Sequence, residues 1–379
     1  MTLHPIKTSI ESLYVHIPFC ASKCSYCVFY SVPAAPDSSR LNFLARLLLE
    51  FDEHAAAGKT DGRPMSSVFI GGGTPTLLAP LELEALLRAI RSRFPLRPDV
   101  EFSIECNPET LTEEKAAVLS AWGVNRVSLG AQSFSSGLRA RLGRSGDPGR
   151  IGPAVRMLRR QGIENIGLDL IYAIPGQCMK EWEADLKAAL AFGPQHLSTY
   201  SLTIEEGSAL AADGSLQAPD EALAVEMWET AEAVAESAGM RRYEISNFAV
   251  PGFECRHNLS AWHAGTYLGC GPAACSFDGV LRWGNPASLE EWMQPEIRRE
   301  EDRIPPEARA AESLLFGLRT VDGWEPCEFK ERSGFDFLEL RGPQIRKLEA
   351  EGLLEFRDGR LRPTRRGLLF NDAIGRELL

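Results

Sequence analysis

Hydrophobic and polar positions follow two alternating patterns over the first two thirds of the chain. Short apolar runs, which predict buried strands, alternate with longer segments whose apolar residues recur every three to four positions, as in an amphipathic helix. The predicted strands cover residues 13–17, 67–71, 100–105, 124–130, 165–171 and 196–202, and the predicted helices cover residues 39–56, 81–94, 112–123, 147–162 and 178–193.

Six strands that alternate with helices indicate repeated βα units. Such units build an α/β fold with a parallel sheet covered by helices, either doubly wound or curled into a full or partial barrel. In each of these architectures the loops at the carboxyl ends of the strands meet on one side and carry the functional site. We therefore expect the chemically distinctive residues to lie at these strand ends.

The last third of the chain differs in pattern. Residues 246–304 are rich in Gly, Pro and Trp and predict irregular loops packed on the sheet, with a polar linker at their end. Beyond them the pattern predicts helix, helix, β-hairpin and helix, with the hairpin turn at Asp358-Gly359, as in a small winged-helix-like α+β module. The predicted units are a core at 1–245, a loop-rich extension and linker at 246–304, and a C-terminal module at 305–379.

Composition and charge narrow the class of function. The chain has 379 residues, of which 44% are hydrophobic and 25% charged, as is typical of a globular protein. Its formal net charge is −11, and residues 305–379 hold 13 Lys or Arg against 14 Asp or Glu. This balance argues against a nucleic-acid partner. No apolar run approaches 18 residues and the first residues lack the layout of a secretory signal, so we expect a cytoplasmic protein.

Three of the nine cysteines, Cys20, Cys24 and Cys27, cluster in the segment CASKCSYCVFY. A structural zinc site favours four ligands, and the next cysteine, Cys106, follows 79 residues later. A thiol redox pair would leave Cys20 unexplained. Three thiolates also suit an iron–sulfur cluster in which one iron stays open to another ligand.

The spacing C-x3-C-x2-C, with Tyr26 before the last cysteine, resembles the signature of the radical S-adenosylmethionine (SAM) superfamily. This resemblance implies a partial (β/α)6 barrel in which the three cysteines hold a [4Fe–4S] cluster whose open iron binds SAM. The run GGGTP at 71–75 resembles the glycine motif of that family, where backbone approaches SAM closely. The SAM contacts that the resemblance implies are Tyr14, Gly72, Gly73, Thr74, Glu105, Gln132, Arg144 and Asp169.

The resemblance extends over most of the chain to the porphyrin-related branch of the superfamily. This branch contains oxygen-independent coproporphyrinogen III dehydrogenases and heme chaperones, which share a C-terminal module of the predicted kind. The dehydrogenases carry a further cysteine two positions after the triplet, where this chain has Phe29, and a longer segment before the first strand. Both differences favour the chaperone type, which implies a heme or porphyrin ligand and a heme-accepting protein that is free or at a membrane surface.

Heme contact in such chaperones is associated with a segment H-N-x-x-Y-W. Here the segment is His257-Asn258 followed by Trp262, with Ala261 at the tyrosine position. The resemblance implies His257 as an axial ligand and Trp262 against the porphyrin face. Cys275 also replaces a histidine that is usual in these chaperones. Two alternatives therefore stay open, the dehydrogenase and a radical-SAM enzyme for another substrate, and no catalytic residue is assigned.

Overall fold

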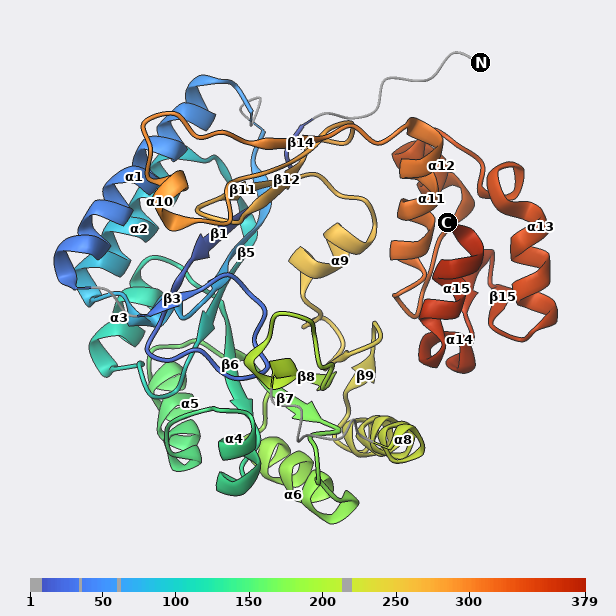
Figure 1. The fold of residues 1–379 in the computed structure, drawn as a ribbon, viewed down its shortest axis with the longest axis horizontal. Helices are drawn as coiled ribbons and strands as arrows, with labels where there is room; N and C mark the ends of the chain where they lie inside the picture. Colours follow the sequence, from blue (N-terminus) through green and yellow to red (C-terminus); the bar gives the residue numbers. More distant parts are fainter. Residues whose placement is uncertain (1–8, 34–35, 60–62, 213–219) are drawn as a thin grey trace.

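Six parallel strands form the centre of the fold. The computed structural model describes residues 9–33, 36–59, 63–212 and 220–379. The six strands pair in chain order and curve into an open barrel (Figure 1), which confirms the predicted partial (β/α)6 architecture. They are β1 (Ser12–Ile17), β4 (Met65–Gly72), β5 (Leu96–Cys106), β6 (Arg126–Gln132), β7 (Asn165–Tyr172) and β8 (His196–Ser201).

Helices cover the outer side of this curved sheet (Figure 1). All five predicted helices are present, as α1 (Asp37–Ala56), α2 (Pro80–Arg93), α3 (Glu113–Ala121), α5 (Ile151–Arg160) and α6 (Met179–Leu190). In the described part of residues 9–245, three further helices were not predicted: α4 (Ser136–Arg141), α7 (Ala209–Ala212) and α8 (Glu221–Ser237).

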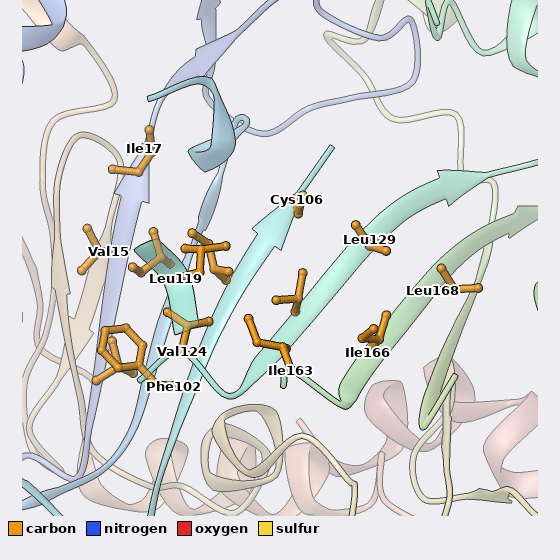
Figure 2. Packing of buried hydrophobic residues seen from close by; sticks show 14 of the residues in the cluster. Val15, Ile17, Phe102, Cys106, Leu119, Val124, Leu129, Ile163, Ile166 and Leu168 are labelled. Carbon is orange, nitrogen blue, oxygen red and sulfur yellow. The ribbon is translucent and has the colours of Figure 1, made fainter. Parts of the chain in front are cut away.

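Strict alternation along the strands separates an apolar outer face from a polar inner face. On β5, Phe102 and Ile104 are fully buried against the helices, whereas Glu101, Ser103 and Glu105 point the other way. Figure 2 shows the apolar layer of this outer face, which packs against residues such as Leu119 of α3. The interior of the barrel therefore carries most of the polar side chains, together with a few apolar ones such as Phe69 and Ile171.

The segment 246–304 is more regular than expected, so the prediction of irregular loops was wrong for much of it. Its strands extend both edges of the parallel sheet: β11 pairs with β1, and β10 pairs with β8. Each strand has only three or four residues, too few for a periodic pattern, and forms because the edges of the sheet need hydrogen-bond partners. The elements are β10 (Asn247–Ala249), α9 (Arg256–Trp262), β11 (Tyr267–Cys270), β12 (Cys275–Phe277), β13 (Arg282–Gly284), α10 (Leu289–Trp292) and β14 (Glu300–Asp302), and β9 (Arg241–Arg242) pairs with β10.

One buried carboxylate ties this extension to the barrel. Glu50 of α1 is fully buried, and its Oε2 accepts hydrogen bonds from the backbone N–H of Gly271 (2.8 Å) and from Trp292 Nε1 (3.2 Å). Its Oε1 accepts from Asn285 Nδ2 (2.7 Å) and Arg299 Nη2 (3.3 Å). Burial acts to raise the pKa of Glu50, but the surrounding donors outweigh it and hold the pKa below its ordinary value.

The C-terminal module has a core of its own, built around residues such as Leu314, Trp324 and Phe329. The predicted hairpin turn is confirmed, since Asp358 and Gly359 both have positive φ. Among the described residues, no helix anywhere in the chain has the length and apolar character that a membrane crossing requires. The module consists of α11 (Pro306–Gly317), α12 (Pro326–Ser333), α13 (Phe337–Ala350), β15 (Leu354–Arg357), β16 (Arg360–Pro363), α14 (Arg365–Leu369) and α15 (Asn371–Leu378), of which α12 was not predicted.

Replacing Glu50 by alanine should destabilise the protein strongly. The variant leaves the Arg299 cation and three further donors without their buried acceptor, so we expect a loss of about 3 kcal/mol or more in the free energy of unfolding. Urea unfolding followed by circular dichroism measures this loss. Asp52→Ala, on an exposed turn of the same helix, removes only a surface ion pair with Arg93 and should cost about 1 kcal/mol or less. Equal losses of unfolding free energy in the two variants would contradict the role of Glu50 in joining the extension to the barrel.

Candidate functional site

Three thiols meet at one cavity of about 500 Å³ at the carboxyl ends of the strands. Cys20 ends the short strand β2 (Phe19–Cys20), and Cys24 and Cys27 lie in the loop between β2 and β3 (Val32–Pro33). Backbone hydrogen bonds fix this loop on both sides of Ser25, whose N–H donates to the carbonyl of Leu142 (2.9 Å) and whose carbonyl accepts from Leu210 (2.7 Å). Figure 1 shows the blue N-terminal loop passing in front of the sheet.

The chemistry of the three thiols suits an iron–sulfur cluster. Burial raises the pKa of Cys27, and the neighbouring thiols of Cys24 and Cys20 raise it further. Three thiolates so placed repel one another unless cationic metal neutralises them. In the part of the chain that the structure describes, no three His, Cys, Asp or Glu side chains are grouped to hold a metal ion. A cluster takes one thiolate on each of three irons, and three thiols that line one cavity can supply them.

The glycine run after β4 lies against the first strand and the cysteines. The N–H of Gly73 donates to the carbonyl of Ile17 (2.8 Å), and the N–H of Thr74 donates to the carbonyl of Phe19 (2.7 Å). A Cβ on Gly73 would lie 2.7 Å from the Phe19 carbonyl oxygen, so the glycine is required for this approach. Thr74 Oγ1 is consequently 3.7 Å from Cys20 Sγ.

Two carboxylates line the same cavity. Ser128 Oγ lies 2.9 Å from both carboxylate oxygens of Asp169, and the N–H of Gly72 donates to Glu105 Oε2 (3.1 Å). Burial, with a further contribution from the charge of Asp169, raises the pKa of Glu105 to about 8. Burial also raises the pKa of Asp169. Such carboxylates can accept hydrogen bonds from hydroxyl groups or pair with an amino group of a ligand.

Arg144 and Gln132 meet at the end of β6. Arg144 Nη2 donates to the carbonyl of Gly130 (2.6 Å), and Arg144 Nη1 lies 3.9 Å from Cys24 Sγ. Gln132 has a φ of 66°, which is strained for a residue with a side chain and coincides with a register shift between β6 and β7. Strain at such a position is common where a side chain is directed into a site.

Sequence reasoning missed one residue that supports Arg144 and two residues that line the cavity. Arg139 donates to the carbonyls of Ala131 (2.6 Å) and Ser145 (3.1 Å), and so joins the loop of Arg144 to the end of β6. The position of Arg139 in the sequence gives no signal of this supporting role. Ser128 and Tyr200 also line the cavity. Both lie on the inner face of their strands, so strand alternation could have identified them.

Tyr14 does not line the cavity, although it is linked to the cysteine loop. The carbonyl of Tyr30, at the end of that loop, accepts a hydrogen bond from His16 Nε2 (2.9 Å). The other ring nitrogen of His16 then accepts from the Tyr14 hydroxyl (3.0 Å). Burial lowers the pKa of His16, which favours this neutral form. Tyr14 therefore supports the loop through His16.

The helix α9 carries His257 and Trp262 to different neighbours. His257 Nδ1 is 3.0 Å from Ser67 Oγ, its ring centroid is 5.2 Å from that of Phe69, and burial lowers its pKa to about 4. The Trp262 ring contacts the C-terminal module, with the Arg319 guanidinium 4.7 Å from its centroid. In Figure 1, α9 lies between the open barrel and that module. Neither residue lines the cysteine cavity, and their joint contact with heme stays a prediction.

Two family models match the chain. Residues 14–189 match the Radical SAM superfamily, and residues 304–370 match the HemN C-terminal domain. The fold is similar to that of the Escherichia coli coproporphyrinogen III oxidase HemN, described as a radical SAM enzyme, with a TM-score of 0.85 and 22% identity over 100% of this chain and 91% of that one. Fold and cysteine cavity together define the class as radical SAM, which implies a [4Fe–4S] cluster and SAM as cofactors.

Relatives over the full length narrow this class. Proteins named heme chaperone HemW are 35% identical in Mycobacterium tuberculosis (strain ATCC 25618 / H37Rv), over 100% of this chain and 97% of the relative, and 32% identical in Bacillus subtilis (strain 168), over 97% and 98%. The Escherichia coli (strain K12) protein of that name is also 32% identical, over 97% and 98%. The chain belongs to the HemW family of radical SAM proteins.

The raised pKa of Glu105 should make the cofactor-free protein less stable as the pH rises. A raised pKa means that the stability contributed by protonated Glu105 is complete below about pH 4.5 and is lost as the pH passes through about 8. Glu105→Gln is neutral at every pH. The melting temperature of this variant minus that of the wild type should therefore increase between pH 6.5 and 9, as measured by scanning fluorimetry. Glu206→Gln, at an exposed position, serves as the control, and a constant difference for Glu105→Gln would contradict the shift.

Proposed function

We propose that the protein is a heme chaperone, which binds heme and passes it to an acceptor protein while holding a [4Fe–4S] cluster and SAM. The observation that carries this proposal is the full-length similarity to proteins named heme chaperone HemW, at 32–35% identity. Phe29 supports it, because the dehydrogenase type carries a cysteine there. We place the protein in the cytoplasm, with an acceptor that is free or at a membrane surface.

In this proposal Cys20, Cys24 and Cys27 hold the cluster. The support is their common position in the lining of one cavity and the mutual repulsion of their thiolates. When bound, the cluster supplies electron-transfer chemistry and an open iron for the methionine end of SAM. The backbone of the cysteine loop holds the three thiols in place through its hydrogen bonds to Leu142 and Leu210.

The remaining polar groups of the cavity would hold SAM. Arg144 suits its carboxylate, since a guanidinium can donate two parallel hydrogen bonds. Glu105 and Asp169 suit the amino group and the ribose hydroxyls, and Gln132 can donate and accept beside them. The backbone of Gly72, Gly73 and Thr74 lets the ligand approach the glycine run closely.

The proposed cluster ligands can be tested against a matched cysteine. After anaerobic reconstitution, alanine variants of Cys20, Cys24 and Cys27 should each lose most of the iron and acid-labile sulfide bound per chain. Cys106→Ala removes a thiol that lines the same cavity from the end of β5 and should keep both iron and sulfide, because Cys106 lies outside the triplet. Retention of iron by the triplet variants, or an equal loss in Cys106→Ala, would show that the ligands are assigned wrongly.

The chaperone function can be tested by binding and transfer. Titration of the cluster-loaded protein with hemin should produce a saturable Soret band, and mixing the loaded protein with a heme-free globin should shift that band to the spectrum of the globin. Absence of a Soret band would refute the proposal. The same protein, given coproporphyrinogen III, SAM and a reductant, should form no vinyl product, whereas product in step with deoxyadenosine would favour the dehydrogenase.

A further inference from the structure

The guanidinium of Arg144 comes from a different loop than the cysteines beside it in the cavity. We call residues 142–146, which follow α4, the arginine loop. Arg144 Nη1 lies 3.9 Å from Cys24 Sγ, although 120 positions separate the two residues in the sequence. Both the arginine loop and the cysteine loop line the cavity. The distance between these two loops therefore determines how far Arg144 lies from the three thiols.

Gly143 brings the two loops into direct contact. The N–H of Ser25 donates to the carbonyl of Leu142 (2.9 Å), and Gly143 follows directly. Gly143 has a φ of 62°, and a Cβ on it would lie 2.1 Å from Ser25 Oγ and 2.9 Å from the Ser25 backbone nitrogen. Side chains do not approach other atoms so closely, so any other residue at this position would push the loops apart.

Each of the two loops is also held by a second anchor. The carbonyl of Ser25 accepts a hydrogen bond from the N–H of Leu210 (2.7 Å). The arginine loop is anchored at its end, where the N–H of Asp147 donates to Glu109 Oε1 (2.8 Å) and a Cβ on Gly146 would lie 2.7 Å from Glu109 Cγ. A side chain added at the contact would therefore have to displace one anchored loop from the other.

Arg144 keeps one donor without a partner at this spacing. Its Nη2 donates to the carbonyl of Gly130 (2.6 Å), whereas its Nε is buried and has no hydrogen-bond partner among the described residues. A buried donor without a partner costs free energy, and the carboxylate of a ligand would satisfy it. In the proposed function the methionine end of SAM binds the cluster iron and pairs with Arg144. One small group can reach both only if the loops stand at a fixed separation.

We propose that Gly143 is a positioning residue for SAM, which sets the separation between Arg144 and the three cysteines through its contact with Ser25. This inference rests on the proposed function, in which Arg144 holds the carboxylate of SAM. Gly143 carries no side chain and so acts on SAM only through this separation. Loss of one hydrogen bond between the guanidinium and the carboxylate should weaken SAM binding by about tenfold or more, because hydrogen bonds between charged groups are among the strong ones.

Calorimetric titration of the cluster-loaded protein with SAM, calculated per bound cluster, tests this role. Gly143→Ala should bind SAM at least about tenfold more weakly than the wild type. Adding Gly143→Ala to a Ser25→Gly background should change SAM affinity much less, because the Oγ that the new Cβ would meet at 2.1 Å is then absent. Gly162→Ala is the control for backbone strain. Gly162 has a φ of 79° and no atom within 4 Å of its Cβ position, so this variant should bind SAM as the wild type does.

Undiminished SAM affinity in Gly143→Ala, or an equal loss in the two backgrounds, would overturn the positioning role and leave the proposed function intact. An equal loss in Gly162→Ala would overturn it as well, because backbone strain alone would then account for the effect. If Gly143→Ala also loses the cluster, return of the cluster in the double variant supports the role, and its continued absence overturns it. If the wild type binds no SAM, the positioning role and the cofactor part of the proposed function fail together.

Hydrogen exchange of the cofactor-free proteins gives a second readout. The peptide that contains Ser25 should exchange faster in Gly143→Ala than in the wild type, because the N–H of Ser25 loses its hydrogen bond to Leu142. Gly162→Ala should leave this exchange rate unchanged. An unchanged rate in Gly143→Ala would mean that alanine fits without separating the loops, and would overturn the inference.

Discussion

The alternation of apolar and polar side chains on six parallel strands is the constraint on which the rest of this structure depends. A parallel sheet buried on both faces normally reads as continuous apolar strands. Here the outer face is apolar, so helices pack on it, and the inner face carries most of the polar side chains. A polar interior cannot collapse into an apolar core. The curved sheet therefore keeps an interior in which Glu105, Ser128 and Asp169 line a cavity.

Backbone contacts, more than side chains, position the cofactor residues. The glycine run is held against the first strand by the N–H groups of Gly73 and Thr74, and the cysteine loop is held at Ser25. The ring of His16 adds a further hydrogen bond to the end of that loop, at Tyr30. Such an arrangement leaves the side chains of the cavity free to contact ligands. The close approach of the two backbones also explains why glycine is needed at position 73, beside the cysteines.

The edges of the sheet connect the barrel to the remainder of the chain. The buried Glu50 carboxylate joins α1 to the strands that extend one edge. Inside the barrel, Glu101 of the central strand β5 accepts hydrogen bonds from the first backbone N–H groups of α9. At the other end of α9, Trp262 and the following His263 contact the C-terminal module.

The local sequence pattern alone determined the parallel core, because the apolar residues of each strand and helix in the βα units repeat with the period of that element. It also determined the cysteine triplet and the hairpin turn at Asp358-Gly359, because short-range spacing carries both. Only the tertiary structure decided the strands of the segment 246–304, which are too short to have a period and exist because the sheet edges need partners. It likewise decided that Arg139 supports Arg144, and that His257 and Trp262 face different neighbours. Contacts between segments that are far apart in the sequence depend on tertiary packing, which local residue spacing does not predict.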